Sequence, residues 1–260
     1  LLCGDESSGL HVDDRASDGA TPLHWAVAGV TSRRAESGER HGFGTGGHRS
    51  TTEWLVRRGA DVRAVTDDGN SVVHWCAWAG QKPLLVWLAA HVDRLARSEE
   101  RESEHPADQP ATASSSSSMM RALNRKGCSA AHWAASGGDL ATCVVLAERG
   151  VDFSRANLEG NTPLTKAIEH GREDVVRWLL TSGRAEAAVG AAAAYAARLS
   201  ARHSADDTTD RISELLQSYL VARHYLQRQR DADAMAAVRF VGPTPSMPRQ
   251  HGTRTASASM

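Results

Sequence analysis

Three histidines and one cysteine are the residues of this 260-residue chain whose spacing could support chemistry. His24, His74 and His132 each stand five residues after a glycine, and histidines at a shared offset could be metal ligands. Cys128 precedes His132 by four residues and forms a local Cys/His pair. A structural zinc ion needs four ligands about 2 Å away, and this pair supplies two. We therefore expect no metal site and no cofactor.

A tryptophan directly follows each of these histidines: Trp25, Trp75 and Trp133. Such a series could form a platform on which the bases of a single-stranded nucleic acid stack, provided that the rings are exposed. A large apolar residue at a fixed position is also what the core of a repeat protein requires. We favour the core interpretation, and we extend it to Trp54, Trp87 and Trp178.

No arrangement of residues indicates catalysis. Residues 42–47 are glycine-rich, but they lack the Lys-Ser/Thr ending of a phosphate-binding loop and follow no expected strand. A Gly-x-Ser-x-Gly nucleophile motif is also missing from the sequence. The five serines from Ser114 to Ser118 could be phosphorylated, although we favour a spacer. We expect a protein that is not an enzyme.

The histidines belong to a repeated unit. The copy Gly127-Cys128-Ser129-Ala130-Ala131-His132-Trp133-Ala134 is followed 33 residues later by Gly160-Asn161-Thr162-Pro163-Leu164-Thr165-Lys166-Ala167. Two further copies lie upstream, Asp18-Gly19-Ala20-Thr21-Pro22-Leu23-His24-Trp25-Ala26 and a weaker one in residues 68–77.

This unit resembles the ankyrin repeat, which has this period and the signature T-P-L-H-x-A. The resemblance implies an all-α ankyrin-repeat solenoid of helix-turn-helix units with short β-hairpin fingers, closed by C-terminal capping helices. It also implies that each histidine hydrogen-bonds the backbone of the neighbouring hairpin, with Thr165 in its place in the fourth copy. Repeats lie about 10 Å apart, so their histidines cannot converge on one ion.

The spacing of the copies predicts the domain organisation. We place four repeats in residues 18–183, after an end of a preceding repeat and a hairpin strand in residues 1–17. The long intervals predict surface insertions at about 31–50, which is glycine-rich, and at about 94–122, which is charged and then serine-rich. Residues 184–230 should form Ala-rich and amphipathic capping helices, and residues 231–260 a disordered tail. The first residue is Leu1 and not Met, so we expect that earlier sequence is missing.

Composition narrows the class of partner. A net charge of −1 argues against general affinity for nucleic acid. No apolar run approaches the 18 residues or so of a membrane span, so we expect no membrane contact. The cysteines lack metal or redox spacing, which favours free thiols in a reducing compartment. We expect a cytoplasmic monomer; the nucleus is compatible with the same features.

Trp78 is the strongest candidate for a binding residue. It stands where the other copies have Ala28, Ser136 and Glu169, at a position that the resemblance places on the concave surface. An exposed aromatic side chain in a groove can dominate a binding energy; alternatively, Trp78 packs against the second insertion. The candidate protein-binding residues, on hairpin tips and inner helices, are Asp18, Asp68, Asn70, Trp78, Lys126, Glu159, Asn161, Glu169 and His170.

The sequence therefore predicts a non-catalytic protein-protein interaction module or scaffold. Its partner, of unknown identity, would bind the concave surface and the hairpin tips. The alternative is the regulatory ankyrin domain of a longer enzyme whose catalytic part lies outside this chain.

Overall fold

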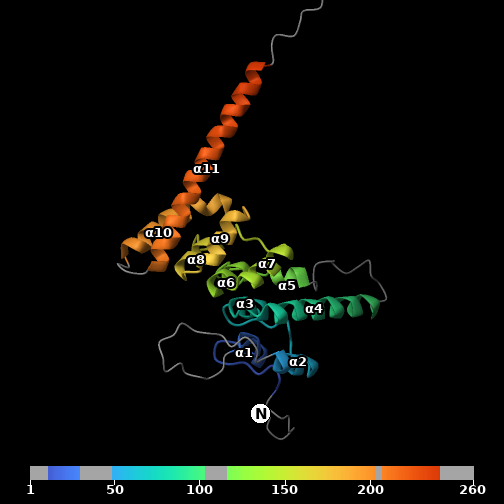
Figure 1. Cartoon of the computed structure of the whole chain (residues 1–260). Coiled ribbons are helices and arrows are strands. Elements are labelled where there is room, and N and C mark those ends of the chain that lie inside the picture. Colours follow the sequence, from blue (N-terminus) through green and yellow to red (C-terminus); the bar gives the residue numbers. More distant parts are fainter. Residues whose placement is uncertain (1–10, 30–48, 103–115, 203–206, 241–260) are drawn as a thin grey trace, which may run out of the picture. The chain divides into compact units, whose positions relative to one another are not determined.

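The computed structural model describes residues 11–29, 49–102, 116–202 and 207–240 (Figure 1). The predicted insertion at about 31–50 lies almost entirely outside these ranges. By internal contacts the chain divides into two compact units, Leu1–Ser218 and Tyr219–Met260.

Four antiparallel helix pairs make up most of the first unit. They are α1 (Pro22–Ala28) with α2 (Arg49–Arg57), α3 (Val72–Trp78) with α4 (Lys82–Glu102), α6 (Ala130–Gly137) with α7 (Leu140–Glu148), and α8 (Pro163–Glu169) with α9 (Glu173–Thr181). The remaining helices are α5 (Ser116–Arg121), the 3-10 turn η1 (Glu186–Ala188), α10 (Val189–Arg202) and α11 (Asp207–Phe240). Strand pairing in the described ranges is limited to the isolated bridges Val65–Ser71 and Leu123–Ser129. The all-helical prediction is thus confirmed.

The helix pairs stack in sequence order. We call α1, α3, α6 and α8 the inner helices, and α2, α4, α7 and α9 the outer helices. Along the inner row α3 contacts α1 and α6, and α8 contacts α6 and α10; along the outer row α7 contacts α4 and α9 (Figure 1). Leu23, Val73 and Leu164 are fully buried between the two rows. A stack of this kind buries a continuous core because each pair covers the apolar face of the next.

Hydrogen bonds between backbones fix the register of the stack. Each inner helix is preceded by a tight loop, which we call a hairpin tip: residues 16–20, 66–70, 124–128 and 157–161. The amide of Asp67 donates to the carbonyl of Asp18 at 3.0 Å, and the next tips repeat this bond from Arg125 to Asp68 at 2.9 Å and from Leu158 to Lys126 at 3.0 Å.

Glycine is required in the first tip because the second tip approaches it so closely. Gly19 has a φ of 76°, and a Cβ placed there would lie 2.8 Å from the amide nitrogen of Asp67 in the next tip. A side chain would therefore strain both the left-handed backbone conformation and the contact between tips.

Both ends of the second predicted insertion are helical, and residues 103–115 lie outside the described ranges. Helix α4 continues through the predicted boundary at residue 94 to Glu102, and α5 occupies Ser116–Arg121. The amide of Ser116 donates to Oδ1 of Asp93 at 3.0 Å, and Met120 is fully buried. These contacts are tertiary and are not encoded by a serine run.

The tryptophans of the outer helices are not core residues, which corrects the sequence interpretation. Trp54 is 41% exposed, with the guanidinium carbon of Arg58 5.1 Å from its ring centroid. Trp87 is half-buried and stacks on His91, and half-buried Trp178 meets the ring of Phe153 edge-on at 5.2 Å. These rings cover the outside of the stack, and aliphatic side chains fill the inside.

The helices after the repeats bury apolar residues in the first unit. Helix α10 contacts α8, and Ile212 and Leu216 of α11 are fully buried. Helix α11 continues to Phe240, so its last ten residues fall in the predicted disordered tail of residues 231–260. The part of α11 in the second unit exposes Val221, Tyr225 and Leu226. Residues 241–260 of the predicted tail lie outside the described ranges.

Candidate binding surface of the inner helices

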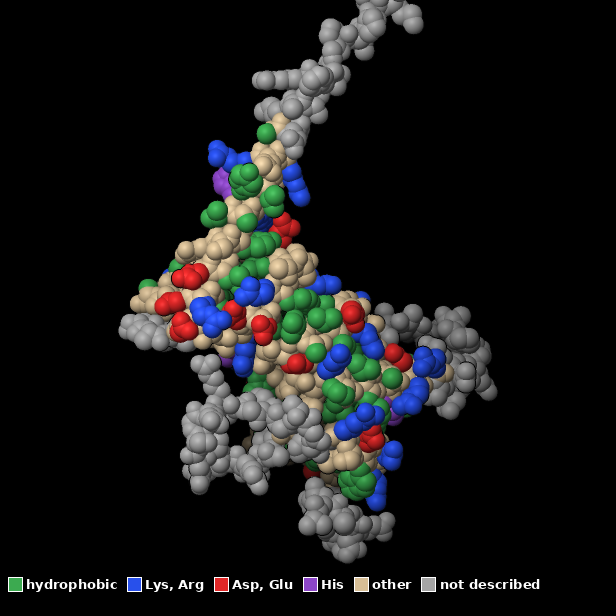
Figure 2. Space-filling model, viewed as in Figure 1, with side chains coloured by type: hydrophobic (Ala, Val, Ile, Leu, Met, Phe, Trp, Pro, Cys, Tyr) green, Lys and Arg blue, Asp and Glu red, His purple; other side chains and the backbone are tan. Residues whose placement is uncertain are grey.

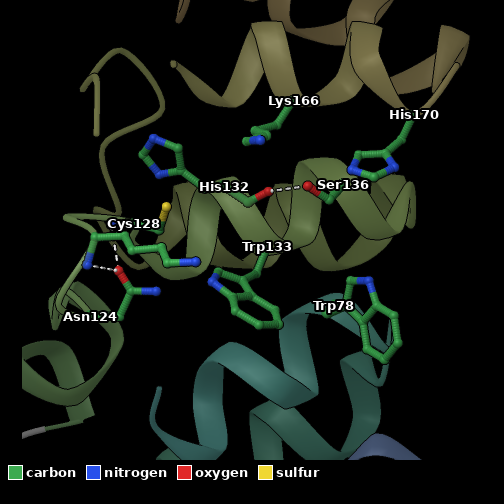
Figure 3. Close-up of a pocket in the computed structure, with 9 residues that line it drawn as sticks. Trp78, Asn124, Cys128, His132, Trp133, Ser136, Lys166 and His170 are labelled. Atoms are coloured by element: carbon green, nitrogen blue, oxygen red, sulfur yellow. Dashed lines mark hydrogen bonds between the residues drawn. The ribbon is translucent and has the colours of Figure 1, made fainter. Parts of the chain in front are cut away.

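A pocket of about 250 Å³ opens on the inner helices and spans three consecutive repeats (Figure 3). We call it the inner-helix pocket. Helix α3 contributes Trp78, α6 contributes His132, Trp133 and Ser136, and α8 contributes Lys166, with His170 capping its C-terminus. Asn124, Lys126 and Cys128 of the third hairpin tip complete the lining. The pocket therefore depends on the stacking of the repeats.

The helical period explains why these side chains meet. In each inner helix the histidine or threonine at the third position is followed directly by Trp25, Trp75, Trp133 or Lys166. Three residues further on stand Ala28, Trp78, Ser136 and Glu169. Residues three apart share one face of a helix, so both rows face the same way when the helices stack.

Indole rings form one side of the pocket. In Figure 3, Trp133 and Trp78 lie opposite Lys166 and His170 across the opening. Trp78 and Trp133 are half-buried, so each keeps apolar surface for a ligand. Earlier in the same row Trp25, 44% exposed, meets Trp75 edge-on at a centroid distance of 5.1 Å and an interplanar angle of 76°. The rings of these two thus pack on each other and do not form parallel platforms.

Basic side chains form the other side. The ammonium of Lys166 donates to Oε2 of Glu169 at 2.8 Å. Burial lowers the pKa of Lys166, but the hydrogen bond and charge of Glu169 outweigh it, and the pKa is raised. His170 has a lowered pKa, chiefly because burial disfavours its charged form. Lys166 therefore carries a positive charge at neutral pH.

The recurring histidines have a structural role, as the resemblance implied. The Nδ1 atom of His74 accepts a hydrogen bond from the amide of Ser71 at 3.1 Å, which closes a capping box at the start of α3. Its Nε2 atom then carries the proton and donates to the carbonyl of Cys128 at 3.1 Å. His24 and His132 make the same pair of bonds, to Thr21 and Asn70 and to Ser129 and Asn161 respectively.

Burial keeps these imidazoles neutral. Loss of solvation lowers the pKa of all three and brings that of His74 to about 4. Thr165, which replaces the histidine in the fourth repeat, accepts from the amide of Thr162 at 2.7 Å and so keeps the cap. Its hydroxyl donates to the carbonyl of Thr162, so the bonds of Thr165 stay within its own repeat.

Two of the three described cysteines have thiols whose pKa is raised by burial. Burial raises the pKa of the Cys76 thiol, and it raises that of Cys143 to about 12. The Cys128 sulfur accepts a hydrogen bond from Nδ2 of Asn157 at 3.2 Å. Within the described ranges no three His, Cys, Asp or Glu residues are grouped as metal ligands would be.

The structure divides the predicted binding residues into three groups. Trp78, Lys126 and His170 line the pocket, and Glu169 joins it through its ion pair with Lys166. The exposed side chains of Asp18, Asp68 and Glu159 lie on hairpin tips outside the pocket lining.

Asn70 and Asn161 form the third group, whose members make hydrogen bonds within and between the hairpin tips. Asn70 is 8% exposed, its carbonyl accepts from His24, and its Oδ1 accepts from Nδ2 of Asn124 at 2.7 Å. The carbonyl of Asn161 accepts from His132, and its side-chain amide donates to Glu159 at 3.2 Å. The Asn70 side chain thus links two neighbouring tips, and the Asn161 side chain bonds within its own tip.

The sequence interpretation missed Trp133 and Lys166. It assigned their position to the core, because three of the four repeats have tryptophan there. Lys166 was the signal against this assignment, since a lysine at an equivalent position indicates that the position reaches solvent.

A comparison with known families agrees with this architecture. Residues 131–180 match the family model described as ankyrin repeats (many copies). The match covers the helix pairs α6–α7 and α8–α9, and the structure shows the same pairing in α1–α2 and α3–α4. Residues 131–180 are therefore ankyrin repeats, and ankyrin repeats are generally protein-protein interaction modules. No curated protein matches this chain.

Within the described ranges no helix has both the length and the apolar character needed to cross a bilayer. On the face of the first unit that Figure 2 shows, acidic and basic side chains are interspersed with hydrophobic ones.

Proposed function

We propose that this chain is a non-catalytic interaction module that holds a partner protein on the inner-helix pocket and the adjoining hairpin tips. The observation that carries the proposal is the pocket itself, in which side chains of three successive repeats combine apolar rings with lysines. A half-buried tryptophan such as Trp78 is the residue type that most often anchors an interface.

Rigidity supports this function. The bonds between tips and the histidine bridges fix each inner helix against the next. A surface that is already ordered loses little conformational entropy when it binds, so more of the contact energy appears as affinity. The acidic tip residues Asp18 and Asp68 would influence the rate of association and the choice of partner more than affinity.

A binding role accounts for the polar groups better than catalysis does. The imidazoles of the three recurring histidines are neutral and have both nitrogens engaged, so none is poised as a general base. The buried thiols of Cys76 and Cys143 have raised pKa values and would be poor nucleophiles. We therefore extend the proposal to a chain without an active site of its own.

We expect Trp78→Ala to reduce strongly the capture of a partner from cell extract by the immobilised chain. Removing an anchoring indole should reduce the retained partner about tenfold or more, the equivalent of 1.4 kcal/mol. Trp54→Ala is the matched control, because it removes an exposed tryptophan from an outer helix. Captured proteins are quantified by mass spectrometry, and circular dichroism establishes that both variants fold.

A partner kept by the parent and by Trp54→Ala, but lost by Trp78→Ala, supports the proposed surface. Loss on Trp54→Ala alone would place the interface on the outer helices. Identical capture by all three proteins would remove the inner-helix pocket from the function.

A further inference from the structure

The lining of the inner-helix pocket is electrostatically one-sided. It contains Lys126, Lys166 and His170 and no Asp or Glu. Glu169 neutralises part of the charge of Lys166 from beside the pocket. Among the described residues no carboxylate pairs with Lys126, whose side chain is exposed on the third hairpin tip. Of the two lysines in the pocket, Lys126 is therefore the one more available to pair with an anionic group of a ligand.

The opposite side of the pocket is apolar. Trp133 and Trp78 come from different helices and border one opening (Figure 3). A ligand that satisfied only the lysines would leave the indoles in water, and a purely apolar ligand would leave the lysines without a counter-charge. The pocket is matched by a ligand that has an anionic and an apolar group close together.

The size of the pocket limits what can enter. Its volume of about 250 Å³ lies below the range of roughly 300–1,000 Å³ of small-molecule sites. That volume suits one or two amino-acid side chains. Because the pocket is open and continues onto hairpin tips, the backbone that carries those side chains can continue along the surface.

We propose that the inner-helix pocket binds an acidic peptide segment of the partner protein. In this arrangement an Asp or Glu carboxylate of the peptide lies against Lys126 and shares Lys166 with Glu169. An adjacent apolar side chain of the peptide packs on Trp78 and Trp133. This inference rests on the proposed function, for which it names the chemistry of the partner.

The test uses a phage-displayed library of random 12-residue peptides, selected on the whole chain. We expect the selected peptides to be enriched in Asp or Glu next to a large apolar residue. Lys126→Glu should weaken the binding of a selected synthetic peptide about tenfold or more, a loss of about 1.4 kcal/mol. Binding should also weaken as salt is raised, because the lysine is exposed.

Arg125→Glu is the matched control, since it makes the same change of charge on the neighbouring residue of the same tip, outside the pocket lining. It should leave affinity within about twofold, a difference of about 0.4 kcal/mol. Selected peptides without acidic enrichment, failure to select any peptide, or equal effects of the two reversals would each overturn the inference.

These outcomes separate the two proposals. Peptides that lack acidic residues but lose affinity with Trp78→Ala would leave the binding surface intact and remove the acidic ligand. Peptides that bind regardless of both Trp78 and Lys126 would contradict the inference and also count against the proposed surface.

Discussion

Gly137→Ala is expected to destabilise the stack by at least about 2 kcal/mol and to weaken partner binding as well. Gly137 is the last residue of α6, and a Cβ placed there would lie 2.2 Å from the carbonyl oxygen and 3.2 Å from the Cα atom of Trp78. Real Cβ atoms do not come so close to backbone, so α3 and α6 would have to separate. Both helices line the inner-helix pocket, and its shape would change with them.

Gly190→Ala provides the control for this prediction. Gly190 lies in α10, and a Cβ placed there meets nothing within 4 Å. Because alanine loses less backbone entropy than glycine in a helix, this variant should be neutral or gain up to about 1 kcal/mol. The free energy of unfolding of each variant is measured by urea denaturation, with circular dichroism and tryptophan fluorescence as the two signals. Equal midpoints for the two variants would show that the inner helices do not pack as closely as the structure indicates.

The predictable part of the fold is the part encoded locally. The offset from Gly127 to His132 specifies a turn, a cap and the start of a helix within six residues, so it was readable without tertiary information. The role of the histidines was likewise predictable, because a side chain that caps its own helix and bridges to the next repeat recurs with the repeat. Replacement by Thr165 preserved the local half of that role.

The features of the fold that the sequence did not predict depend on packing between segments that are distant in sequence. Ser116 and Met120 carry no helical pattern, and their order follows from contacts such as the bond to Asp93. The candidate site shows the same division. Trp78 stood out because its equivalents are small or polar, whereas Trp133 and Lys166 were hidden at a position shared by large residues. Whether that position faces core or solvent is set by how the helices stack.

Protonation of His74 should make the stability of the stack depend on pH between about pH 4 and pH 6.5. Burial lowers its folded-state pKa to about 4, whereas an unfolded histidine titrates near 6.5. Between these values the unfolded chain binds the extra proton. The contribution to stability is therefore complete above pH 6.5 and is lost as pH falls towards 4.

We expect the free energy of unfolding to fall by about 2 kcal/mol from His74 alone between pH 8 and pH 5, at up to 1.36 kcal/mol per pH unit. His24 and His132 also have lowered pKa values and act in the same direction. Urea unfolding at a series of pH values measures this slope.

His74→Thr isolates the contribution, because it imports the cap that Thr165 makes in the fourth repeat. At pH 8 the variant should be less stable than the parent by about 1–3 kcal/mol, since the carbonyl of Cys128 loses its buried partner. Its stability should then fall less steeply with acidification, so the two curves converge towards pH 5. Parallel curves would mean that His74 is protonated as readily in the folded chain as in the unfolded one. A flatter curve would show that the bridge between repeats requires the neutral imidazole, because a proton on Nδ1 would face the amide of Ser71 that this atom now accepts from.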